Sequence, residues 1–300
     1  MRTTLVVGML SVAFALGIGP AGGPIAAQAS KKVYISVDME GLSGVSGDDQ
    51  ISAEGPGYER GRRLMADDTN AAIRGALAGG ATDVLVNDSH GGQRNLRLED
   101  LHPSARLISH SFKRVGMMEG LDETFDAVIF IGYHTKADSF EGLFAHTGSG
   151  VVRDLRVNDL SIGEGGLNTL LASWYGVPVV LVTGDDKAVA QVREVATRAQ
   201  GVVVKRAINE RAVELRPLEV VHREIEDAAR EAVAAATRVE PIRESVYRVR
   251  LQFRNTLYPE VASAFPSIER PAPDTVAFET DSMPHAYRLI RVLYRFINPN

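Results

Sequence analysis

Four short apolar runs, rich in β-branched residues, alternate with segments of helical periodicity over the first two thirds of this chain. The runs are residues 33–37, 84–86, 127–131 and 178–182. Apolar residues recur at helical spacing within 65–77, 167–174 and 189–196. Fully buried strands that alternate with helices are typical of βαβ units, in which helices cover both faces of a parallel sheet. We therefore predict an α/β fold: a three-layer structure around a sheet of mostly parallel strands.

The pattern changes after Gly201. Pro217 precedes an amphipathic helical stripe, and residues 247–253 alternate apolar with polar side chains, which indicates a strand with one face in solvent. Residues 283–297 are expected to form a closing helix. We therefore predict an α/β domain over 30–200, followed by a smaller α+β domain over 201–300.

The first 29 residues have the pattern of a secretory signal peptide. Arg2 is the one charged side chain before Lys31, residues 5–18 are almost wholly apolar, and Ala27-Gln28-Ala29 forms an A-x-A cleavage site. Gly and Pro interrupt the apolar stretch before it reaches the length of about 20 residues that a spanning helix needs. We expect cleavage after Ala29, export to the periplasm or medium, and no stable membrane insertion of the mature chain; an uncleaved anchor is the alternative.

Composition restricts the available chemistry. The chain has no cysteine, so any metal must be bound by His, Asp and Glu. Its formal net charge is −5 and it has no basic block, so we do not expect it to bind nucleic acid.

Residues that can bind metal follow each predicted strand. Asp38 and Glu40 follow the first, His90 the second and His134 the third; Asp185 and Asp186 follow the fourth. Ligands bind open α/β sheets beyond the carboxyl ends of their strands, so these groups are expected to share one crevice. His and carboxylate ligands suit Zn²⁺, Mn²⁺ or Co²⁺.

Each residue alone has a structural alternative. A D-x-E sequence is common in turns, His90 is as often a loop histidine, and Asp185-Asp186 is more often a helix cap than a ligand pair. Four other histidines are expected to be surface or packing residues: His102, His110, His222 and His285.

Four motifs, in order along the chain, resemble the D-aminopeptidase family of binuclear zinc peptidases, peptidase family M55, which includes a protein of dipeptide-transport operons. They are V-D-M-E-G at 37–41, N-D-S-H at 87–90, I-G-Y-H at 131–134 and G-E-G-G-L-N at 163–168. Residues 58–62 and 184–186 are also similar to family segments. The similarity covers nearly all of the predicted mature chain.

The resemblance implies two Zn²⁺ per subunit and five ligands. Asp38 would bridge both ions, Glu40 and His134 would complete one site, and His90 and Glu164 the other. His146 matches a catalytic histidine. From the residues alone, Glu164 would be interpreted as a first-turn helix acid. The resemblance further implies a ring-like homo-oligomer such as a decamer.

We therefore predict a metal-dependent aminopeptidase that releases N-terminal D-amino acids such as D-Ala from short peptides. The sequence leaves two alternatives open. One is another bimetal hydrolase, namely an amidase, esterase or phosphatase. The other is a non-catalytic exported peptide-binding protein.

Overall fold

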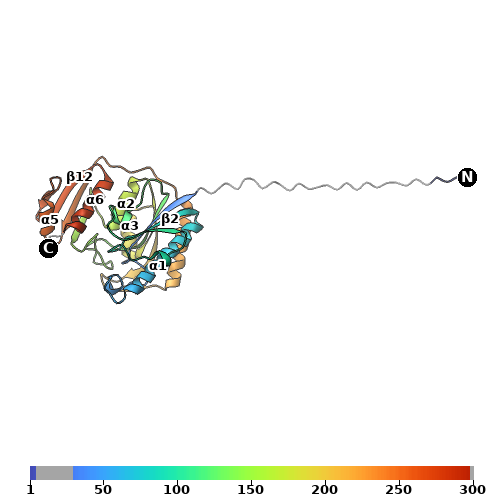
Figure 1. Cartoon of the computed structure of the whole chain (residues 1–300), viewed down its shortest axis with the longest axis horizontal. Coiled ribbons are helices and arrows are strands. Elements are labelled where there is room, and N and C mark those ends of the chain that lie inside the picture. The colour runs from blue at the N-terminus through green and yellow to red at the C-terminus, as the bar shows by residue number, and fades with distance from the viewer. Residues whose placement is uncertain (5–29, 298–300) are drawn as a thin grey trace.

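A computed structural model describes residues 1–4 and 30–297 and contains two sheets (Figure 1). The predicted signal peptide lies almost entirely outside the described residues. Within the described part of the chain, no helix is long and apolar enough to cross a membrane.

The first sheet has seven strands in the order β3-β2-β1-β4-β7-β8-β9. All neighbouring strands are parallel except β9, which runs antiparallel to β8. The strands are β1 Lys31–Val37, β2 Ala81–Asp88, β3 Ala105–Ile108, β4 Ala127–Tyr133, β7 Val179–Asp185, β8 Gln200–Ala207 and β9 Val213–Leu215. The predicted α/β fold with a mostly parallel sheet is confirmed.

Helices cover both faces of this sheet because its central strands are apolar on both sides. Helices α1 (Tyr58–Ala78) and α4 (Leu218–Ala235) pack on the face to which Val33, Ile35 and Val37 of β1 point. Helices α2 (Glu164–Trp174) and α3 (Asp186–Val195) pack on the other face, with Tyr34.

The second sheet is antiparallel, with the order β11-β12-β10-β5-β6. Its strands are β5 Val152–Val157, β6 Leu160–Ser161, β10 Tyr247–Phe253, β11 Glu269–Ala272 and β12 Thr275–Thr280. Strand β10 alternates buried and more exposed side chains, as its sequence pattern predicts. Helices α5 (Leu257–Ala262) and α6 (Met283–Arg291) accompany this sheet, and a π-helical turn over Val292–Phe296 follows α6.

Sheet membership does not follow the boundary predicted near residue 200. Strand β8 and helix α4 lie after that point, yet they complete the parallel sheet and its helical layer. The hairpin β5–β6 lies before it, yet it pairs through β5 with β10 in the second sheet. Packing against β10 places the hairpin there, and its own residues carry no sign of this long-range pairing.

Candidate metal centre

The carboxyl ends of three adjacent parallel strands bring four of the predicted ligands together. Asp38 and Glu40 follow β1, His90 follows β2 and His134 follows β4. Glu164 is the first residue of α2, which begins beside His134 at the carboxyl ends of these strands. The ends of β1 and β4 are held together by hydrogen bonds from Asp38 N to Ile131 O and from Gly41 N to Gly132 O, both 2.8 Å.

Two glycines allow this close approach. A Cβ on Gly41 would lie 2.6 Å from the carbonyl carbon of Gly132, and closer still to the carbonyl oxygen of Tyr133. Gly132 has φ +73°, a conformation that costs other residues about 1–2 kcal/mol. The loop that carries Asp38 and Glu40 can therefore lie directly against the end of β4.

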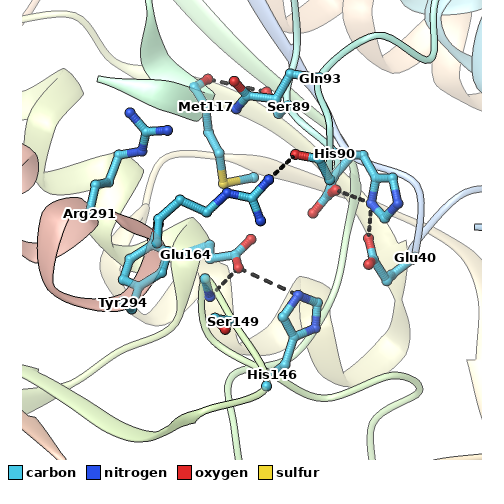
Figure 2. Close-up of a pocket in the computed structure, with 15 residues that line it drawn as sticks. Glu40, Ser89, His90, Gln93, Met117, His146, Ser149, Glu164, Arg291 and Tyr294 are labelled. Atoms are coloured by element: carbon cyan, nitrogen blue, oxygen red, sulfur yellow. Dashed lines mark hydrogen bonds and ion pairs between the residues drawn. The ribbon is translucent and has the colours of Figure 1, made fainter. Parts of the chain in front are cut away.

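Asp38, Glu40, His90 and Glu164 line one cavity of about 280 Å³ (Figure 2), and His134 contacts Asp38 and Glu164 from outside its lining. His90 Nδ1 lies 3.2 Å from Asp38 Oδ1 and 3.0 Å from Glu40 Oε2. His134 Nε2 lies 3.4 Å from Asp38 Oδ2 and 3.2 Å from Glu164 Oε2. Asp38 therefore stands between the two imidazoles, with one carboxylate oxygen toward each.

Three overlapping groups have ligand atoms within 4.8 Å of one another. They are Asp38–Glu40–His90, Asp38–His134–Glu164 and Glu40–His134–His146. Asp38 is common to the first two, which suits a carboxylate shared by two ions. The family resemblance pairs Glu40 with His134, as the third group does; it pairs His90 with Glu164, a pair that none of these groups contains.

Backbone carbonyls orient both ligand imidazoles. His90 Nε2 lies 2.8 Å from Ile51 O, and His134 Nδ1 lies 2.8 Å from Thr135 O. A carbonyl only accepts, so each of these nitrogens carries the proton. In the neutral ring the other nitrogen therefore points its lone pair at the carboxylates. Metal-bound histidines usually have this arrangement, in which the second ring nitrogen donates its proton to a carbonyl or carboxylate.

The charge of the cluster also fits bound cations. Asp38, Glu40 and Glu164 are buried, and in the part of the chain that the structure describes no Lys or Arg forms an ion pair with any of them. Buried carboxylates normally have a counter-ion or a metal. Burial would raise the pKa of Glu40, but His90, His134 and His146 outweigh it and hold that pKa well below its usual value.

His146 lies beside the cluster in the loop between β4 and β5. Its ring stacks on that of His134 with centroids 4.0 Å apart. Its Nδ1 donates to Phe144 O at 2.9 Å, while Nε2 lies 3.7 Å from Glu164 Oε1 and borders the cavity (Figure 2). The position fits a group that acts on substrate, although His146 also belongs to one of the three possible ligand groups.

The remaining sequence candidates have other contacts. Asp185 caps α3 by accepting hydrogen bonds from Lys187 N and Ala188 N, as its helix-cap alternative predicts. Asp186 accepts from Ala207 N. His222 Nε2 lies 3.0 Å from buried Asp68, on the helical layer of α1 and α4.

Two buried lysines hold the ligand-bearing loops, and sequence reasoning missed both. Lys205 on β8 donates to Glu40 O at 2.6 Å and Val45 O at 2.7 Å. Lys113 donates to Asn87 Oδ1 at 2.7 Å and to Asp88 O at 2.5 Å, just before His90. Burial lowers the pKa of Lys205 to about 7 and that of Lys113 to about 8.

Sequence reasoning also missed part of the cavity wall. Arg291, Tyr294 and Arg295, from the end of α6 and the π-helical turn, line the cavity that holds the ligand cluster. From the sequence they are predicted only as part of a closing helix over residues 283–297. No local signal distinguishes them from surface residues.

Comparison with known proteins identifies the family of this chain. The model of the M55 peptidase family, described as D-aminopeptidase, matches residues 31–292. The chain belongs to this family. A D-aminopeptidase of Bacillus subtilis (strain 168) is 37% identical over 264 residues, which cover 87% of this chain and 96% of the relative.

A solved structure is also similar. It is described as the Zn-dependent D-aminopeptidase DppA from Bacillus subtilis, a self-compartmentalizing protease. It superposes with a TM-score of 0.83 at 36% identity and covers 87% of this chain and 96% of its own. The family predicted from the four motifs is therefore confirmed, together with the fold and the peptidase class.

Proposed function

We propose that this protein is a binuclear zinc aminopeptidase that releases N-terminal D-amino acids, such as D-Ala, from short peptides. The observation that carries the proposal is the cluster of three buried carboxylates and two oriented imidazoles, with Asp38 between the imidazoles and four of the five side chains lining one cavity. Family membership supports D-residue substrates, and the Zn-dependent relative supports zinc over Mn²⁺ or Co²⁺.

We assign five residues to metal binding: Asp38, Glu40, His90, His134 and Glu164. When bound, two zinc ions would supply the Lewis acidity and the lowered pKa of water that peptide hydrolysis at neutral pH needs. Asp38 would serve both ions because each of its oxygens faces a different imidazole. The carbonyls of Ile51 and Thr135 would hold the imidazoles in the ligand tautomer.

We assign His146 to the reaction itself. Because its Nδ1 proton is donated to Phe144 O, its Nε2 offers a lone pair at the cavity wall. There it could accept a proton from the attacking group, pass a proton to the leaving amine, or attack the carbonyl directly. Its partial exposure, 29% of the side chain, leaves it accessible to a peptide.

The decisive test is turnover by zinc-loaded protein on three substrates: D-Ala-p-nitroanilide, L-Ala-p-nitroanilide and p-nitrophenyl phosphate. We expect EDTA-sensitive hydrolysis of the D-alanyl substrate in clear preference to the other two. Preference for the phosphate ester would favour another bimetal hydrolase. Binding of D-alanyl peptides without turnover at full metal occupancy would favour a peptide-binding protein.

We also propose that the chain is exported and works as a homo-oligomer. The leader over residues 1–29 supports export to the periplasm or medium, where D-Ala-containing wall peptides occur. The description of DppA as self-compartmentalizing supports a closed assembly such as a decamer. Mature protein starting at Ser30, and its mass in solution by light scattering, would test the two parts separately. Full-length chain retained in membranes, or a monomer, would contradict them.

A further inference from the structure

The wall of the cavity opposite the β1 and β2 ligands is positively charged. Arg291 ends α6 and Arg295 lies in the π-helical turn that follows it, and both line the cavity. In Figure 2, Arg291 and Tyr294 lie on the side of the cavity away from Glu40 and His90. The guanidinium group of Arg291 therefore lies on the side of the cavity away from Glu40 and His90, and that of Arg295 reaches Gly91 O, beside His90.

Arg291 is a buried cation without an acidic partner. It is 5% exposed, donates to Lys113 O and lies with its guanidinium 5.6 Å from the Phe296 ring centre. Among the residues that the structure describes, no carboxylate comes within ion-pair distance of it. A buried guanidinium has five donors and is rarely left without an anion. Its surroundings are therefore suited to an anion that enters the cavity.

Two glycines make room for this wall. A Cβ on Gly116 would lie 2.7 Å from Arg291 Cζ, and a Cβ on Gly148 would lie 2.7 Å from two ring carbons of Tyr294. Both glycines have positive φ, +47° and +68°. The guanidinium and the phenol ring are thus seated against backbone and held in place, as a preformed binding site requires.

Two further groups at the cavity have unused hydrogen-bonding capacity. Arg295 donates from Nη2 to Gly91 O at 2.9 Å, which leaves its other donors free of partners within the described chain. Gln93 is 5% exposed, and its Oε1 has no hydrogen-bond partner among the described residues. Because the two ends of an amide are assigned from their contacts, Gln93 can also present its NH₂ to an anion.

We propose that Arg291 and Arg295, assisted by Gln93, bind the C-terminal carboxylate of the peptide substrate. The inference rests on the proposed function and names its substrate class: short peptides with a free C-terminus. The scissile bond would lie at the metal ligands, and the carboxylate would accept hydrogen bonds from the guanidinium groups. An extended dipeptide spans roughly 7 Å, a length that suits a cavity of this size.

The test compares D-Ala-D-Ala with D-Ala-D-Ala-amide, which differs in lacking the carboxylate. Loss of a hydrogen bond to a charged group is expected to lower kcat/KM by roughly 10- to 100-fold. We expect the wild-type protein to prefer the free acid by about that factor. Arg295→Gln and Arg291→Lys should each lower the acid-to-amide ratio toward one, mainly through KM. Arg288→Gln, an exposed arginine on α6 that donates to Pro284 O, is the matched control and should keep the wild-type ratio.

Arg295 is exposed, so Arg295→Gln is expected to fold even if substitution of the buried Arg291 prevents folding. A wild-type ratio near one, with EDTA-sensitive turnover of both peptides, would overturn the carboxylate subsite and leave the proposed function intact. An Arg295→Gln protein with the full wild-type ratio would also overturn the assignment of Arg295. Absence of turnover on either peptide and on D-Ala-p-nitroanilide would refute the proposed function, and the subsite with it.

Discussion

Gly41→Ala is expected to disrupt the metal centre without altering any ligand. The new Cβ would lie 2.6 and 2.7 Å from the carbonyl atoms of Gly132, whereas ordinary contacts begin near 3.4 Å. The obstructing atoms are backbone, so the loop carrying Asp38 and Glu40 would have to move by roughly 0.8 Å, which exceeds the positional tolerance of a functional site, about 0.5 Å. It would also strain the hydrogen bond from Gly41 N to Gly132 O.

Overpacking of this kind costs about 1–3 kcal/mol, and each kcal/mol lowers Tm by about 2–4 °C in a domain of this size. We expect Tm to fall by roughly 2–12 °C and bound zinc to fall well below that of wild type. The assay is differential scanning fluorimetry with metal analysis of the same sample. Gly150→Ala is the control, because its Cβ would meet nothing within 4 Å at the same cavity. Wild-type zinc content in Gly41→Ala would refute the proposed role of this close approach.

Three further predictions concern the residues around the ligands. His146→Ala should keep its zinc and lower kcat by about 10²- to 10⁴-fold; loss of zinc as well would make His146 a ligand, and activity within a few-fold of wild type would remove it from the mechanism. Lys205→Met should leave the carbonyls of Glu40 and Val45 without their donor and lower the free energy of unfolding by about 2–6 kcal/mol in urea titration, and an unchanged midpoint would contradict this. Zinc affinity should weaken as pH falls, because protons compete for the ligand nitrogens of His90 and His134: burial opposes their protonation, but the adjacent carboxylates outweigh it and raise both pKa values well above the ordinary value. Equal zinc affinity in mildly acidic and mildly alkaline buffer, measured by competition with a chelator, would argue against that competition.

The parallel sheet and four of the five proposed ligands are predictable from local sequence patterns. The four apolar runs predict strands β1, β2, β4 and β7 of this sheet, and the parallel arrangement places the residues after Val37, Asp88 and Tyr133 on one edge of the sheet. Glu164 is different because an acid in the first turn of a helix already has a local explanation. Its assignment depended on the family resemblance.

Other features depend on long-range packing. The β5–β6 hairpin joins a sheet whose main strands lie about 90 residues later, so its partner is not visible locally. Lys205 looks like an ordinary polar residue in a strand, and its burial arises from the Glu40 loop that crosses it. Arg291 likewise belongs to the cavity because α6 returns to the ligand end of the first sheet.

Anomalous diffraction at the zinc edge, on crystals of the zinc-loaded protein and of Asp38→Ala, would test the binuclear centre most directly. In the wild-type protein we predict two zinc peaks in the cavity, both bound by the Asp38 carboxylate at about 2.0–2.2 Å and together contacting Glu40, His90, His134 and Glu164. In Asp38→Ala both peaks should be lost or strongly depleted. A single zinc, zinc bound away from Asp38, or two full peaks in the variant would contradict the proposed centre.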